Sequence, residues 1–214
     1  MESYVDKSKV SLRPVNKKLA KDMIEKYHYS GVMSACRYTL GVFYKSYNHK
    51  FFDGNVDDFI TIACYGFPVG RSVVSSMFTE DVLENKNVLE LKRLFIHDGY
   101  GKNIESYVIS QSFKWLKEYS PDIKVLISYA DPEQAHDGCI YQATNWIYQG
   151  CGDFQLAPTY SLRVSEDDDW MHSRSVYSKY GSAAPKNLIK AIGRDFWLKK
   201  EASKHRYIYF LGNK

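Results

Sequence analysis

Along several short stretches of the chain, apolar residues alternate with polar ones, which is the pattern of β-strands that bury one face. This alternation predicts strands at 88–96 and 205–211. Further short strands are predicted at 10–13, 38–44, 59–65 and 160–164. The stretch 123–129, IKVLISY, is a nearly continuous apolar run and predicts a strand buried on both faces. In 88–96 the alternation predicts a single face made of Leu89, Leu91, Arg93 and Phe95.

Four further segments repeat their apolar residues at helical spacing. They are 17–27, which Asn16 can cap, 103–119, 138–148, which Gly150 can end, and 185–193. In 138–148 we expect the apolar Ile140, Ala143 and Ile147 to face a sheet, with Tyr141 on another side of the helix.

The order of these elements predicts an α/β fold. Strands alternate with helices, so we expect a mixed, twisted sheet with helices on both faces. The strands 88–96 and 123–129 are expected side by side and parallel at its centre, joined by the helix 103–119. No linker interrupts the 214 residues, so the chain is expected to form one domain over 1–214.

Charge and aromatic residues change this picture at the C-terminal end. The chain is rich in aromatic residues (Tyr 18, Phe 11, Trp 4), and its net charge is +4. Between 179 and 206, eight Lys and Arg residues face two acidic ones, a local charge of +6, which leaves −2 for the rest. A basic segment interleaved with aromatic residues, about 179–211, favours a phosphate backbone. A solvated helix face followed by a strand is the alternative.

Several classes of protein are disfavoured by the sequence. No apolar run approaches the roughly 18 residues that span a bilayer, and the first residues lack the apolar core of a secretory signal. The four cysteines have neither a CxxC pair nor zinc spacing, which indicates reduced thiols in a cytoplasmic protein. A phosphate-binding P-loop, HExxH, GxGxxG, a nucleophile elbow and a DPPY methyltransferase signature are all missing from the sequence.

Two candidate sites lie where predicted strands end. After 88–96 the turn HDGYGKN, with Gly99 and Gly101, leads into a helix whose first turn holds Ser106, an arrangement that can bind an anion or serve only as a turn. At the end of 123–129 lie Ser128, inside the stretch, and Asp131, just after it, where open α/β sheets bind ligands. Because Asp before Pro also starts turns, Asp131 has a structural alternative.

Two further candidates carry hydrogen-bonding aromatic side chains. Tyr141 opens the helix predicted at 138–148, where it fits either recognition or a half-buried position. His28 and Tyr29 follow the first helix. A histidine there can act as a base, bind a metal or cap the helix end.

Five motifs in order resemble one family. The segments KYHYSG, ELKRLFI, SYADP, IYQATNWIYQG and KHRYIYFL, which span 26 to 211, resemble the bacteriophage Mom family of DNA adenine-modification proteins. The strand at 123–129 and the segment after it also resemble the second half of a GNAT-type acyltransferase. The resemblance implies a GNAT-like sheet whose two central parallel strands separate at their C-terminal ends.

The resemblance also implies an activity. It is the conversion of the N6 amino group of adenine in double-stranded DNA to a methylcarbamoyl form, which protects phage DNA from host restriction. The target base would be flipped out of the duplex and stacked on a tyrosine. Acyl-CoA, in the first place acetyl-CoA, is the implied cofactor, and an iron ion with unassigned ligands is associated with such proteins. The loop HDGYGKN departs from the usual GNAT phosphate loop, which leaves the group donor open.

Matching motif to motif assigns roles to individual residues. The catalytic candidates are His28, Tyr29, Arg93, Asp131 and Tyr141. The cofactor candidates are Arg93, Ser106, Ser128 and Tyr141, and the DNA contacts are Lys199, Lys200, Lys204 and Arg206. Either His28 or Asp131 can be the general base. Arg93 on an apolar face needs an anionic partner, for which Asp131 or a donor phosphate is suited.

Two other functions fit the same residues. One is a GNAT acetyltransferase that acts on an amine of a hypermodified DNA base, a protein or a small molecule. The other is a DNA-binding accessory protein that retains the fold without catalysis. The basic, aromatic C-terminal segment favours DNA over a small amine.

Overall fold

The computed structural model describes residues 6–44, 60–70, 72–78, 80, 83–98, 100, 102–151, 159–193 and 195–212. The chain divides into two compact units. The larger unit comprises Met1–Tyr129, Gly138–Gln149 and Arg206–Lys214, and the smaller one Ala130–Asp137 and Gly150–His205. No linker in the sequence marks these boundaries. None of the helices in the described part of the chain has the length and apolar character needed to cross a membrane.

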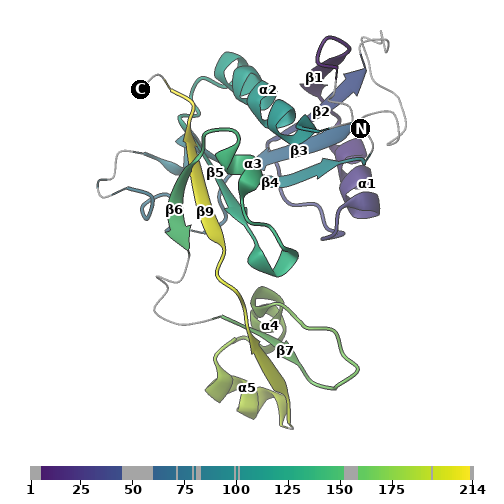
Figure 1. The fold of residues 1–214 in the computed structure, drawn as a ribbon. Helices are drawn as coiled ribbons and strands as arrows, with labels where there is room; N and C mark the ends of the chain where they lie inside the picture. The colour runs from purple at the N-terminus through teal and green to yellow at the C-terminus, as the bar shows by residue number, and fades with distance from the viewer. Residues whose placement is uncertain are drawn as a thin grey trace. The chain divides into compact units, whose positions relative to one another are not determined.

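A seven-stranded sheet forms the centre of the larger unit (Figure 1). Its strands follow the order β1-β2-β3-β4-β5-β9-β6. Their bounds are β1 Val10–Pro14, β2 Tyr38–Tyr44, β3 Thr61–Gly66, β4 Val88–Ile96, β5 Val125–Ala130, β6 Ile147–Cys151 and β9 His205–Phe210. Strands β1 to β4 pair antiparallel, whereas β4 and β5 pair in parallel. The predicted parallel neighbours are therefore confirmed.

Helices cover both faces of this sheet. Helix α1 (Lys17–Tyr27) begins at Asn16, whose side-chain oxygen accepts the Lys18 N–H at 2.8 Å, and it packs against a cluster that includes Cys64 of β3. The next residue of β3, Tyr65, points to the opposite face, where its hydroxyl bonds Ser112 of α2 (Ile104–Tyr119). The two-sided arrangement predicted from the sequence is thus confirmed.

Strands β4 and β5 separate soon after they begin. Their pairing runs from Val88 opposite Val125 to Glu90 opposite Ile127, yet β4 continues to Ile96 and β5 to Ala130. The parallel strands therefore diverge at their C-terminal ends, as expected. Backbone groups of β4 beyond Glu90 lack a ladder partner on the β5 side.

A bulge in β4 overturns one prediction. Cys64 lies opposite Arg93 and Tyr65 opposite Leu91, so Lys92 is an extra residue in β4. Because an inserted residue reverses the faces that follow it, Leu91 shares the α2 face with Tyr65 and Arg93 shares the α1 face with Cys64. The single face predicted for 88–96 is wrong, since the sequence alternation runs through the bulge unchanged.

The helix predicted at 138–148 is also wrong. Helix α3 spans only Cys139–Gln142, and Asn145 then adopts a left-handed φ of 61° before β6 starts. Tyr141 is buried, whereas Ile147 is 51% exposed, the reverse of the predicted faces. The residues after 143 are largely β-branched or aromatic and favour a strand.

The smaller unit has its own small core. Strands β7 (Tyr160–Arg163) and β8 (Trp197–Lys200) form an antiparallel pair beside α4 (Ser173–Tyr180) and α5 (Pro185–Ile192). Leu162, Val176 and Leu188 make up its buried centre. A strand near β7 and a helix near α5 were predicted, whereas α4 and β8 were not. Two short 3₁₀ turns, Asn85–Asn87 and Pro132–Gln134, complete the described elements.

Candidate functional site

The polar side chains of the larger unit meet where β4 and β5 separate. Ser128, near the end of β5, is 1% exposed, and its Oγ lies 3.1 Å from the Leu91 carbonyl oxygen and 2.8 Å from the Tyr141 hydroxyl. A serine hydroxyl has one proton, so it donates to one of these oxygens at a time. Ser128 thus links the two diverging strands to the phenol of Tyr141.

Tyr141 is held on several sides. Its ring centroid lies 5.0 Å from that of Tyr207 and 5.3 Å from that of Trp146. Burial raises the pKa of Tyr141 to about 12. The bond to Ser128 lowers this pKa, whereas the negative charge of neighbouring ionisable groups, Tyr29 first among them, raises it further. The phenol is therefore protonated at neutral pH and available as a proton donor.

His28 and Tyr29 follow directly after α1. The His28 N–H bonds the Ile24 carbonyl at 3.0 Å, which closes the helix. Its Nδ1 accepts the Ser30 N–H at 3.1 Å and lies 2.8 Å from the Ser30 Oγ. The side chain of Tyr29 is 61% exposed, and its ring packs on His28 at 4.3 Å between centroids.

The bond from Ser30 decides the tautomer of His28. A backbone N–H can only donate, so Nδ1 is an acceptor and the ring proton of the neutral histidine is on Nε2. His28 in this state presents an N–H donor, rather than a proton acceptor, at Nε2. The backbone N–H of His28 closes the helix and its Nδ1 accepts from Ser30, so Nε2 remains the ring atom that can act in the site.

Arg93 contacts carbonyl groups. Its Nε donates to the Val32 oxygen at 3.1 Å and its Nη1 to the Lys92 oxygen at 2.7 Å. These carbonyls hold the guanidinium without neutralising its charge. The guanidinium also ties the segment after α1 to the bulge of β4.

Asp131 belongs to the smaller unit and has partners there. Its Oδ1 accepts the Glu133 N–H at 3.1 Å, which caps a 3₁₀ turn, and its Oδ2 lies 2.8 Å from the Lys204 Nζ. The turn-forming alternative for Asp131 is therefore present. Arg93 lies in the larger unit, so each of these two charged groups is held by contacts within its own unit.

The predicted DNA contacts are divided between the two units. Lys199 pairs with Glu133 at 3.3 Å, and Lys204 pairs with Asp131. Arg206, in the larger unit, donates to the Ser76 hydroxyl at 2.9 Å and to the Ser76 carbonyl at 3.0 Å. Lys200 is exposed on β8. The sequence predicted this basic segment but not its internal partners.

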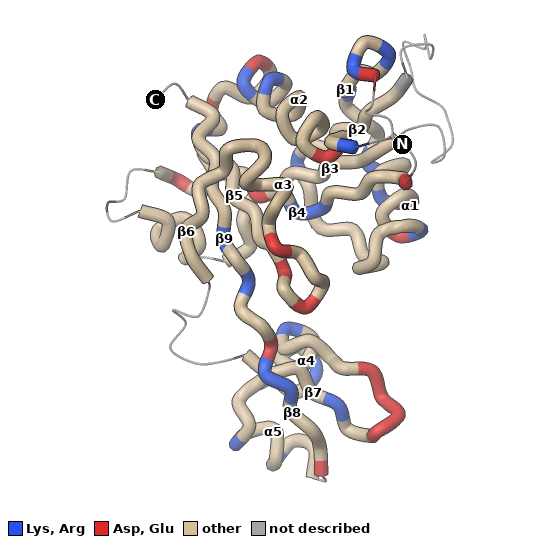
Figure 2. Tube along the Cα trace, viewed as in Figure 1, with Lys and Arg blue, Asp and Glu red and all other residues tan. Residues whose placement is uncertain are grey.

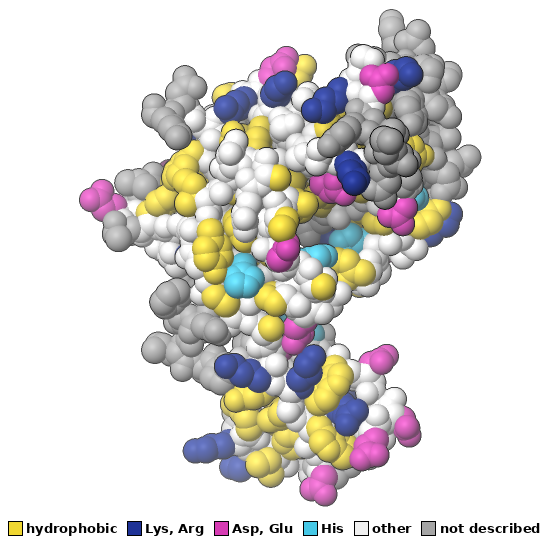
Figure 3. Space-filling view, in the orientation of Figure 1, with side chains coloured by type: hydrophobic (Ala, Val, Ile, Leu, Met, Phe, Trp, Pro, Cys, Tyr) yellow, Lys and Arg dark blue, Asp and Glu magenta, His cyan; other side chains and the backbone are white. Residues whose placement is uncertain are grey.

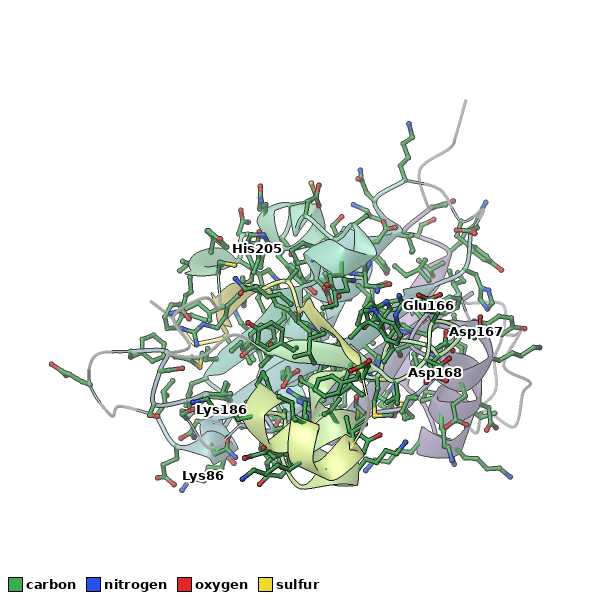
Figure 4. The ribbon with its side chains drawn as sticks, turned by 90° about the horizontal axis from the view of Figure 1, so that it is seen from below. Lys86, Glu166, Asp167, Asp168, Lys186 and His205 are labelled. Atoms are coloured by element: carbon green, nitrogen blue, oxygen red, sulfur yellow. The ribbon has the colours of Figure 1, made fainter. Side chains whose placement is uncertain are left out.

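Acidic and basic side chains occupy different parts of the smaller unit. The acidic run that includes Glu166, Asp167 and Asp168 lies on one side of the α4 and α5 layer, away from Lys186 of α5 (Figures 2 and 4). On the visible face of the same unit, Lys and Arg side chains border hydrophobic ones (Figure 3). A cavity of 540 Å³ opens beside this acidic run, lined by Arg163, Asp168, Lys179 and apolar residues of the core.

The start of α2 is the remaining predicted anion site. Ser106 uses its hydroxyl locally and donates to the Asn103 carbonyl at 3.1 Å. Asn103 has a left-handed φ of 65° and no side-chain cap. Gly99 and Gly101 lie outside the described residues, as does Arg194 of the basic segment. This local hydrogen bond of Ser106 is compatible with the start of α2 with or without a bound phosphate.

The residues present do not fit an iron ion. Within the described ranges, no group of three or more His, Cys, Asp or Glu side chains converges on one point. The Nδ1 of His28 already accepts a backbone N–H, and Asp131 pairs with a lysine. The iron suggested by the sequence resemblance is therefore not supported, and no step below uses it.

Two members of the site were not predicted. Tyr207 of β9 is 3% exposed, its ring packs against Tyr141 at a tilt of 33°, and its hydroxyl lies 3.4 Å from the Gln142 amide nitrogen. Glu90 of β4 contributes its charge to the raised pKa of Tyr141. The alternation in 205–211 signals a strand, but only the sheet order places that strand next to β5.

Comparisons with known proteins identify the family of the chain and its fold. The model of the Mom protein family matches residues 9–214. The methylcarbamoylase mom of Escherichia phage Mu is 26% identical over 206 residues, which are 92% of this chain and 73% of that protein. Arabidopsis thaliana NAA60 in complex with acetyl-CoA aligns with a TM-score of 0.51 at 10% identity, over 94% of this chain and 98% of that one.

A chimera of the spermidine N-acetyltransferase SpeG from Vibrio cholerae and hSSAT aligns with a TM-score of 0.50 at 7% identity. That alignment covers 95% of this chain and 96% of the other. At such low identity these matches describe the fold, and they confirm the GNAT-like class predicted from the sequence.

Proposed function

The chain belongs to the Mom protein family, and on that premise we propose that it is a transferase that acts on adenine in double-stranded phage DNA. The proposed product carries a methylcarbamoyl-type group on N6, which protects the DNA from host restriction inside the bacterial cell. The name of the phage Mu relative supports this reaction. The observation that carries the proposal is the buried Ser128–Tyr141 pair at the point where β4 and β5 diverge.

An acyl-CoA thioester is the proposed donor. Acetyl-CoA is its simplest form, but the methylcarbamoyl product requires a methylcarbamoyl group on the sulfur. The arm of coenzyme A is an extended chain with amide groups, and the edge of β4 beyond Leu91, where the pairing with β5 has ended, offers backbone groups that can bind such a chain. The solved structure of NAA60, which has a similar fold, is a complex with acetyl-CoA and supports this class of donor. Arg93 and Ser106 are the proposed contacts to the charged parts of the donor.

The chemistry required explains the choice of Tyr141. The N6 amine attacks the thioester carbonyl, so a C–N bond forms and the C–S bond breaks. The leaving thiolate needs a proton, and a phenol with a pKa of about 12 holds one at neutral pH. The group on sulfur decides the product, because an acetyl thioester gives an acetylated adenine and a methylcarbamoyl thioester gives the methylcarbamoyl form.

The amine must also lose a proton. Since Nε2 of neutral His28 carries a hydrogen, we assign His28 to donation toward the developing carbonyl charge. Asp131, named by the motif match, is the remaining candidate for the proton acceptor. Tyr29, largely exposed beside His28, is the proposed stacking surface for the flipped adenine. Lys199, Lys200, Lys204 and Arg206 are the proposed phosphate contacts.

Expression in a bacterium followed by mass spectrometry of its digested DNA tests the proposal. We expect a new deoxyadenosine adduct from the wild type and none from Tyr141→Phe. Tyr107→Phe is the matched control, because Tyr107 is also buried and its hydroxyl also makes a hydrogen bond, but to the Val10 carbonyl of β1, which is three strands from β4 in the sheet order. Unmodified DNA in cells that contain folded wild-type protein would overturn the proposed reaction.

A further inference from the structure

Two cysteines meet on the α1 face of the sheet, outside the site described above. Cys64 of β3 is fully buried, and Cys36, from the segment between α1 and β2, packs partly buried against the same cluster. The Cys36 thiol donates to the Ser34 carbonyl at 3.1 Å while its side chain packs against the cluster that contains Cys64. The segment is held beside β3, because the Arg37 N–H donates to the Tyr65 carbonyl at 2.7 Å.

Positive charge surrounds the more accessible thiol. Arg93 is the cross-strand partner of Cys64 on this face, and Lys92 precedes it in the bulge. The neighbouring Cys64 thiol lowers the pKa of Cys36, against the effect of burial, and the charges of Lys92, Arg93 and Lys17 lower it further. Burial and the neighbouring thiol raise the pKa of Cys64. One sulfur of the pair is thus activated and the other is protected.

We propose that Cys36 is a site of covalent thiol modification and that Cys64 resolves it to an intrachain disulfide. The co-reactant is a peroxide: the Cys36 thiolate attacks one peroxide oxygen, which gives a sulfenic acid and releases hydroxide. The Cys64 thiol then attacks that sulfur, so the S–S bond forms and water leaves. Two thiols lose two electrons, and the peroxide oxygens are reduced to the level of water.

The consequence is local to the segment after α1. This segment also carries Val32, whose carbonyl accepts the Arg93 Nε–H. In the reduced chain, hydrogen bonds hold this segment beside β3. A disulfide from Cys36 to Cys64 would attach the segment to β3 covalently. The reaction uses neither Tyr141 nor Ser128, so it is independent of the proposed adenine modification.

Peptide mass spectrometry after brief alkylation of the native, full-length protein tests the first step. Cys139 is exposed and is the matched competitor, since accessibility alone favours it. We expect Cys36 to be alkylated several-fold faster than Cys139 at neutral pH, and Cys64 to react only after unfolding. Equal or faster labelling of Cys139 would contradict an activated Cys36.

Hydrogen peroxide tests the second step. The wild type is expected to yield a linked peptide pair that contains Cys36 and Cys64, and Cys36→Ser is expected to yield none. In Cys64→Ala, a dimedone adduct on Cys36 is expected in place of the disulfide. If the wild type forms no Cys36–Cys64 link under peroxide, the proposal is overturned, whether or not the Cys64 variant folds.

Discussion

The Ser128 Oγ lies 2.8 Å from the Tyr141 hydroxyl, and this contact connects the end of β5 to the first turn of α3. Ser128→Ala removes it without adding bulk. We expect the transferase rate to fall while the free energy of unfolding drops by only about 0.5–1.5 kcal/mol, since one hydrogen bond is lost. Adduct yield and thermal unfolding of the same preparation check both parts. A fully active Ser128→Ala variant would remove the serine from the mechanism.

The raised pKa of Tyr141 predicts a pH profile. A phenol that titrates at about 12 remains protonated through the alkaline range in which enzymes are usually assayed. We therefore expect no loss of rate between neutrality and about pH 10 from this residue. The rate of adduct formation on duplex DNA, measured across that range, checks the prediction. A wild-type rate that falls within that range, on DNA that stays bound, would contradict it.

Gly138 predicts a packing effect near the same tyrosine. It adopts a left-handed φ of 81°, and a Cβ there would fall on the Tyr207 ring and hydroxyl. Gly181, which ends α4 at φ 73° with nothing within 4 Å of a Cβ, is the matched control. Gly181→Ala should cost about 1–2 kcal/mol from backbone strain alone, and Gly138→Ala more. Chemical unfolding of both variants compares them, and equal costs would exclude a steric contribution from Tyr207.

The sequence predicted the elements whose local signals agree with the fold. Asn16 caps α1 as expected, and β4, α2 and β5 follow the strand–helix–strand pattern closely. The divergence of β4 and β5 was anticipated through family resemblance. The serine and tyrosine that meet there were both named as candidates, although from separate motifs.

The remaining features depend on contacts between distant segments. The bulge at Lys92 leaves no mark in the alternation of 88–96, because only the pairing with β3 reveals an extra residue. Tyr207 joins the site because β9 lies beside β5, which is a property of the sheet order. The short α3 could have been anticipated, since Asn145 tolerates a left-handed conformation and aromatic residues follow it.

Glu201 predicts acid sensitivity of the smaller unit. Burial opposes its ionisation, but the Ser173 N–H at 2.8 Å and the Ser161 hydroxyl at 2.9 Å, together with His172, hold the pKa of Glu201 below its ordinary value. A lowered carboxyl pKa contributes stability above the unfolded-state value, and this contribution is lost as the pH falls through the folded-state value.

Glu201→Gln should therefore lower the free energy of unfolding near neutrality by about 1–3 kcal/mol. The difference from the wild type should shrink as the solution becomes acidic. Thermal unfolding at a series of pH values measures this gap. A gap that stays constant with pH would show that hydrogen bonding, and not the charge, is what Glu201 contributes.

The basic segment predicts a salt dependence of DNA binding. Lys200 is exposed on β8, whereas the Lys204 ammonium forms an ion pair with the Asp131 carboxylate at 2.8 Å. If both reach DNA phosphates, each alanine variant should lower the slope of log affinity against log salt by about one. Lys204→Ala should also remove the ion-pair partner of Asp131. At saturating DNA, the adduct yield should therefore change in Lys204→Ala but not in Lys200→Ala.

Lys86→Ala is the control and should leave the slope unchanged, because Lys86 is an exposed lysine of the larger unit that pairs with Glu84 at 2.9 Å. Duplex binding measured over a range of salt concentrations distinguishes these cases. An unchanged slope in the Lys199, Lys200 and Lys204 triple alanine variant would mean that the segment is a solvated surface.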